Sequence, residues 1–144
     1  MDYSEISSRT RVLHVSRTLR LYIAGDSLQE IRLRPVSKAI FLLYLRHPEG
    51  ISFKDLWTFR RELTDIYGMV SRADDMDKLN AVLDHMLYGF NVMSVNCTRL
   101  RHELERYLDV DEMEEFRIKG AQGAPKFISV DRSRIVWNSS AGRP

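Results

Sequence analysis

The sequence holds a single cysteine, Cys97, among its 144 residues. One thiol cannot form a disulfide within the chain, and it cannot supply the paired cysteines of a redox CxxC motif or a zinc site. Such scarcity is typical of proteins in a reducing compartment, so we expect a cytoplasmic protein. Cys97 falls among apolar residues at helical spacing, which favours a small core residue over a nucleophile.

Long hydrophobic runs are also missing. No stretch approaches the roughly 18 apolar residues that indicate a membrane-spanning helix. The N-terminal segment carries Asp2 and Glu5 where a signal peptide has basic residues, and it lacks the apolar run of such a peptide. We therefore expect no membrane association.

Catalytic and metal-binding patterns are absent as well. The four histidines are scattered, and none belongs to an HExxH spacing. The cluster "DDMD" at residues 74–77 lacks the glycine and final glutamate of a calcium loop, and is expected to complement a helix N-terminus instead. The glycines of "GAQGAP" lack the Lys and Ser or Thr of a phosphate-binding loop. The sequence therefore predicts no enzyme, no cofactor and no metal site.

What is present is ordinary for one globular domain: 44% hydrophobic and 29% charged residues in a chain long enough for a single core. The charge is unevenly distributed. Residues 1–72 carry 12 basic and 8 acidic side chains, residues 73–115 carry 4 and 11, and residues 116–144 carry 6 and 1. The basic ends suit an anionic partner, provided that folding brings them onto one surface.

The first third of the chain predicts strands followed by a helix. Residues 11–15 and 19–33 alternate in hydrophobicity, and the turn residues "AGDS" make the second stretch a hairpin. A helix then begins at Pro35 and ends before Pro48 and Gly50.

Three more helices are predicted in the middle of the chain. Ser52 and Asp55 approximate a capping box for a helix that Gly68 ends. A further helix spans residues 75–88, and Asn91 is a suitable N-cap for a helix over 91–108. On that last helix the predicted buried stripe is Met93, Cys97, Leu100, Leu104 and Leu108, and the opposite face carries Val95, Thr98, Arg99, His102 and Arg106.

The end of the chain predicts short strands. After an acidic connector over residues 109–115 come "FRIK" and "KFISV", separated by "GAQGAP", and then the apolar "IVW" at 135–137. The order is therefore strands, helices and a hairpin. The whole chain, 1–144, is expected to be one domain, with strands at 11–33, a helical core at 35–108, a wing at 116–137 and a tail at 138–144.

This order, together with three motifs, resembles the winged-helix DNA-binding effector domain of two-component response regulators, the OmpR type. The helix "MSVNCTRLRHEL" is similar to that family's V-D-V-H-I-x-R-L-R-x-x-L, "RIKGAQGAPKF" to its hairpin, and "LRPVSKAIFLLYLRHPEG" to its first helix. The resemblance covers roughly residues 19–130. It implies a bacterial, stand-alone winged helix-turn-helix of α+β class, with an N-terminal antiparallel sheet, three to four helices and a C-terminal hairpin wing.

The resemblance also implies a transcriptional regulator that binds double-stranded DNA through the helix at 91–108 and the basic wing. Positions matching Val95, Thr98 and Arg99 would approach bases, and those matching Asn96 and Arg101 would contact phosphates. On the wing, Lys119 matches a basic residue that the family uses in the adjacent groove. The full set of expected DNA-binding residues is Asn91, Val95, Asn96, Thr98, Arg99, Arg101, His102, Arg106, Arg117 and Lys119.

A second hypothesis remains open. Glu103, Glu105 and the acidic connector would repel phosphate, which favours a winged-helix module for protein interaction or homodimerisation instead. In that case the inserted helix at 75–88 is the expected partner surface. Pairing of Arg99 and Arg101 with these carboxylates would favour protein interaction, and a continuous positive face through Arg117 and Lys119 would favour DNA.

Overall fold

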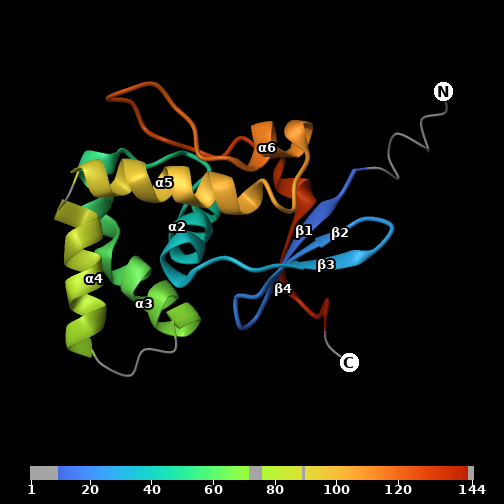
Figure 1. The fold of residues 1–144 in the computed structure, drawn as a ribbon, viewed down its shortest axis with the longest axis horizontal. Helices are drawn as coiled ribbons and strands as arrows, with labels where there is room; N and C mark the ends of the chain where they lie inside the picture. Colours follow the sequence, from blue (N-terminus) through green and yellow to red (C-terminus); the bar gives the residue numbers. More distant parts are fainter. Residues whose placement is uncertain (1–9, 72–75, 89, 143–144) are drawn as a thin grey trace. The chain divides into compact units, whose positions relative to one another are not determined.

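The computed structural model describes residues 10–71, 76–88 and 90–142 (Figure 1). Contacts divide the chain into two compact units, which are described one at a time. The first combines the described parts of residues 1–32 and 130–144, and the second spans residues 33–129. Strands form the first unit and helices dominate the second, so the predicted α+β class is confirmed.

The first unit is a four-stranded sheet with the strand order β3-β2-β1-β4. Strands β1 (Val12–Ser16), β2 (Leu21–Ala24) and β3 (Leu28–Ile31) pair antiparallel, which confirms the predicted hairpin within residues 19–33. The fourth strand, β4 (Ile135–Ser139), runs parallel to β1. The sheet as a whole is therefore mixed: the predicted antiparallel pairing is confirmed for its three N-terminal strands, and β4 adds a parallel pair that the prediction lacks.

Strand β4 also corrects the predicted extent of the wing, which had included residues 135–137. Ile135 is buried and pairs with Leu13 of β1, so these residues complete the sheet instead. The Arg134 guanidinium helps to fix this register, because its Nε and Nη2 donate to the Arg11 carbonyl at 3.1 and 2.9 Å. A parallel pair needs a long connection, and residues 33–129 supply it.

Helix α2 (Pro35–Arg46) is the central helix of the second unit, and it contacts both α3 and α5. Pro35 stands at its start, where a missing N–H costs nothing. Every side chain from Ala39 to Leu45 is buried, so the helix is covered on nearly all sides. A helix that is apolar around its whole circumference belongs in the middle of a bundle.

The predicted capping box after α2 is wrong. Ser52 makes no side-chain capping bond and is itself buried, and a 3-10 helix, η1 (Phe53–Phe59), precedes α3 (Arg60–Ser71). Helix α3 also continues through Gly68, where the sequence predicts its end. A glycine inside a helix costs only about 1 kcal/mol relative to alanine, which neighbouring helix residues offset.

Helix α4 (Met76–Tyr88) matches the predicted helix closely, whereas α5 (Phe90–Leu104) differs at both ends. Asn91 is the second residue of α5 and not its N-cap, and its side chain lies outside the described part of the structure. The helix ends at Leu104, whose carbonyl accepts the N–H of Leu108 at 3.0 Å as the chain turns.

The acidic connector is a helix, α6 (Val110–Phe116). Asp109 and Glu112 form a reciprocal capping box: each backbone N–H donates to the other's carboxylate, at 2.8 and 2.9 Å. Met113 and Phe116 are buried on one side. Two of the acidic residues therefore start a helix, and the apolar residues that follow them anchor it by burial.

Candidate nucleic-acid interface

Helix α5 has a buried face that holds it in the second unit. Met93, Leu100 and Leu104 are buried, as the predicted stripe requires, and Leu108 beyond the helix end is buried too. Cys97 is half-buried, and burial raises the pKa of its thiol to about 12. A thiol of such high pKa stays protonated at neutral pH, which agrees with a packing role.

Asn96 does not lie where the resemblance implies. Its side chain is only 9% exposed, because the position falls between Met93 and Leu100 on the inner side of the helix. It is therefore set apart from the exposed residues of the expected DNA-binding face.

The outer face of α5 carries five of the expected residues in exposed positions: Val95, Thr98, Arg99, His102 and Arg106, the last just past the helix end. Val95 is 48% exposed, so its methyl groups are accessible on this face. The Thr98 hydroxyl donates to the Ser94 carbonyl at 3.1 Å. Within the described residues, the guanidinium groups of Arg99 and Arg106 form no hydrogen bond or ion pair.

A second row of charges on α5 is partly neutralised. Arg101 Nε lies 3.8 Å from Glu105 Oε1, and His102 Nδ1 lies 3.6 Å from Glu105 Oε2. All three side chains are about half exposed or more, and such surface pairs contribute at most about 1 kcal/mol. An incoming phosphate can therefore compete with Glu105 for Arg101.

Glu103, by contrast, is turned inward and closes the N-terminus of α2. Its Oε1 accepts the Arg34 backbone N–H at 2.8 Å, and its Oε2 accepts the Ser37 hydroxyl at 2.5 Å and Arg34 Nη2 at 3.2 Å. Partial burial alone would raise the pKa of this carboxyl, but the bonds from Arg34 and Ser37 outweigh it and lower the pKa. Glu103 is thus a structural cap from a neighbouring helix, a role with no local signal in the sequence.

The residues after α6 form no regular hairpin. Only isolated antiparallel bridges join Lys119 to Phe127 and Lys126 to Ile51, so the predicted strands "FRIK" and "KFISV" are wrong as regular elements. Phe116 belongs to α6, and glycines and proline in the loop interrupt any ladder. The bridges nonetheless fix the 117–127 segment against the turn that follows α2.

Two of the basic side chains in the 117–127 segment contact α6. Arg117 Nη2 lies 3.4 Å from Glu114 Oε1, and Lys119 Nζ donates to the Glu114 carbonyl at 2.6 Å. Lys126 Nζ donates to the carbonyls of Gly120 and Ala121 at 2.7 and 3.1 Å, which holds the loop closed. The segment contributes three cations and no carboxylate of its own.

Two cavities lie between α5 and the 117–127 segment, so the two run side by side (Figure 1). The smaller, of about 120 Å³, has both Arg101 and Arg117 in its wall. The larger, of about 340 Å³, is lined by Lys54, Ser94, Gln122 and Lys126, among others, and by no acidic residue of the described chain. Lys54 and Lys126 could not be predicted from the sequence, because only the fold brings them close to Ser94 of α5.

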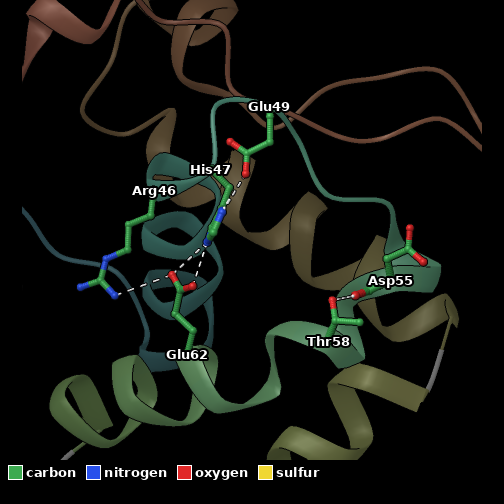
Figure 2. Close-up of polar contacts among 6 residues, drawn as sticks. All are labelled: Arg46, His47, Glu49, Asp55, Thr58 and Glu62. Carbon is green, nitrogen blue, oxygen red and sulfur yellow. Dashed lines mark hydrogen bonds and ion pairs between the residues drawn. The ribbon is translucent and has the colours of Figure 1, made fainter.

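Another cluster of polar side chains lies at the C-terminal end of α2 (Figure 2). His47 Nε2 lies 2.8 Å from Glu62 Oε1 of α3, and His47 Nδ1 lies 2.9 Å from Glu49 Oε1. Arg46 reaches the same Glu62 at 3.8 Å, and the His47 ring meets the Phe59 ring edge to face at 4.7 Å.

Both imidazole nitrogens face a carboxylate, which requires both to carry a proton. Burial lowers the pKa of His47, but the hydrogen bonds to Glu62 and Glu49 outweigh it and raise that pKa. Its hydrogen bonds and ion pairs join the C-terminal end of α2 to α3.

The described residues contain no group of histidine, cysteine and carboxylate side chains that could hold a metal ion. Within the same residues, no helix has the length and apolar content needed to cross a membrane. The chain matches no protein-family model, no curated protein and no solved structure. The case for function therefore depends on the geometry of α5 and its neighbours.

Proposed function

We propose that the protein is a winged-helix protein that binds duplex DNA, with α5 in the major groove and the 117–127 segment against the adjacent backbone. The observation that carries this proposal is the outer face of α5, where Arg99 and Arg106 are exposed and unpaired within the described residues. The element order supports it: a helix, a bridge at Ile51, further helices, and then a bridged loop beside the last long helix.

The chemistry of the face suits DNA. The planar fork of Arg99 can pair with guanine O6 and N7, and the methyl groups of Val95 can pack on a thymine methyl. Arg101 and Arg117, which share a cavity wall, would bind phosphates, as would Lys54 and Lys126. Lys119 would contribute a further backbone contact.

The inward position of Glu103 strengthens the proposal. Its carboxylate is occupied by Arg34 and Ser37, and its side chain is only 14% exposed. It therefore adds little repulsion on the outer side of α5, where Glu105 is the remaining acidic residue of the helix region.

The test is fluorescence anisotropy of a labelled duplex of random sequence, titrated with protein at low and near-physiological salt. We expect salt-sensitive binding. In the double variant Arg99→Ala, Arg101→Ala, affinity should fall, and loss of the phosphate contact of Arg101 should lower the magnitude of the salt slope by about 1. The matched control is Arg17→Ala, Arg61→Ala, which removes the same charge from exposed positions that belong neither to α5 nor to the 117–127 segment.

If both double variants lost affinity equally, net charge and not the α5 face would govern binding, and the proposed site would be wrong. If the unsubstituted protein did not bind the duplex even at low salt, the proposed function itself would be excluded.

A second candidate is a winged-helix module that binds another protein. The ion pairs of Arg101 with Glu105 and of Arg117 with Glu114 favour it, because cations engaged by carboxylates are less available to phosphate. It becomes the better proposal if the duplex titration fails while the chain forms a dimer or captures a partner through α4.

A further inference from the structure

The groove beside the proposed DNA face has the features of a small-molecule site. Its volume is about 560 Å³, within the usual range for ligand pockets. Helices α2, α4 and α5 all contribute to it, and its lining includes Val36, Ala81, Val82, Val92 and Val95. These aliphatic side chains give it an apolar wall.

Three polar side chains complete the lining: His85 of α4, and Asn96 and Arg99 of α5. Among the described lining residues there is no carboxylate to neutralise Arg99, and Arg99 forms no ion pair with any other described residue. A guanidinium at the edge of an apolar groove binds a carboxylate most strongly, through two parallel hydrogen bonds. The Asn96 amide, nearly buried on the same helix, can add a donor.

We infer that this groove binds a small aliphatic carboxylate, with the hydrocarbon against the valines of α4 and α5 and the carboxylate on Arg99. The hydrocarbon of such a ligand matches the aliphatic wall of the groove, and its single carboxylate matches Arg99. Burial of the hydrocarbon supplies affinity at about 25 cal/mol per Å², and Arg99 supplies selectivity for the anion.

Competition between this ligand and DNA is also expected, and this expectation rests on the proposed function of α5. Arg99 and Val95 line the groove and also lie on the outer face of α5. A carboxylate bound to Arg99 and a guanine bound to Arg99 exclude each other. Ligand and duplex therefore compete, and each lowers the affinity of the other by the same factor.

The experiment is a titration of the full-length chain with octanoate, followed by proton–nitrogen correlation NMR, beside a parallel titration with 1-octanol. We expect saturable shifts at groove amides such as Val82 and Val95. Octanol should bind about tenfold more weakly, and Arg99→Gln should weaken octanoate by about tenfold, as expected for loss of a charge-assisted bond. Arg61→Gln on α3 is the matched control and should leave octanoate binding unchanged.

Equal binding of octanol and octanoate, an unchanged affinity in Arg99→Gln, or no shifts at millimolar octanoate would each overturn the inference. Because this titration contains no DNA, its result is independent of whether the proposed function holds. Where the duplex binds, saturating octanoate should then weaken anisotropy-detected binding, and unchanged duplex affinity would overturn the competition.

Discussion

The two ends of helix α2 are both fixed by a glutamate from another helix, but in chemically opposite ways. At the N-terminus, Glu103 of α5 accepts the backbone N–H of Arg34 and the Ser37 hydroxyl. At the C-terminus, Glu62 of α3 bonds to the imidazole of His47 (Figure 2). The first contact needs an ionised carboxylate, and the second needs a protonated histidine as well. One helix thus depends on two titrations of opposite sign.

The largest effect is expected when the N-terminal contact is broken. Glu103→Ala leaves the Arg34 N–H and the part-buried Ser37 hydroxyl without their acceptor, and should lower the free energy of unfolding by about 2 kcal/mol. Urea denaturation measures this change. The control is Glu105→Ala, which removes an exposed carboxylate of the same region and should change stability by less than about 0.5 kcal/mol. Equal losses of stability in the two variants would show that the bonds of Glu103 to Arg34 and Ser37 contribute no more than an exposed carboxylate.

The turn at the other end of α2 is tested by Gly50→Ala. Gly50 has a φ of +92°, and a Cβ there would stand 2.8 Å from the Lys126 carbonyl. We expect a loss of about 1–2 kcal/mol, together with displacement of the 117–127 segment. Gly68→Ala is the control: its Cβ would meet nothing within 4 Å inside α3, so thermal unfolding should show a gain of about 0.5–1 kcal/mol. A harmless Gly50→Ala would mean that the bridge at Ile51 tolerates a different turn.

The C-terminal contact itself should be weaker than the cap at the N-terminus. Glu62→Gln removes the charge that holds His47 and Arg46, and should cost about 1 kcal/mol at pH 6. The pKa of His47, followed by NMR of the ring protons, should fall in this variant. An unchanged His47 pKa would mean that Glu49 alone raises it.

The smallest effects are expected in the pH dependence of the unfolding free energy, which should differ between the contacts at the two ends of α2. The pKa of His47 is raised on folding, so its stabilisation is complete below about 6.5 and is lost as pH rises through the higher folded pKa. The pKa of Glu103 is lowered, so its stabilisation is present above 4.5 and is lost as pH falls through the folded pKa. The pH dependence of the unfolding free energy should therefore become shallower on the alkaline side in His47→Gln and on the acidic side in Glu103→Gln. If one variant removed both slopes, the two ends would not be independent.

The same contrast explains what the sequence could predict. Helices α2, α4 and α5 and the β2–β3 hairpin follow from side-chain periodicity, because each element shows its buried face locally. The exposed positions Thr98, Arg99 and His102 follow from the same helical wheel. The cap by Glu103 does not, because a carboxylate on α5 completing α2 depends on the packing of two helices distant in sequence.

Other differences have a similar origin. The parallel pairing of β4 with β1 is decided by which sheet edge is free, and no local pattern encodes it. The 117–127 segment has strand-like residues, but its glycines and proline interrupt the ladder, and Lys126 holds its loop closed. The groove between α4 and α5 arises only when three helices meet, so its lining residues carry no common motif.

The parallel β1–β4 pair also has a consequence for synthesis on the ribosome. His14 and Ser139, whose side chains meet at 2.7 Å, are separated by 125 positions, so β1 emerges long before its neighbour exists. Until then one edge of β1 offers unpaired N–H and C=O groups to any other strand. Nascent chains on neighbouring ribosomes therefore expose the same unpaired strand edge, which promotes aggregation. A chaperone that covers β1 until β4 emerges would raise the yield of folded protein.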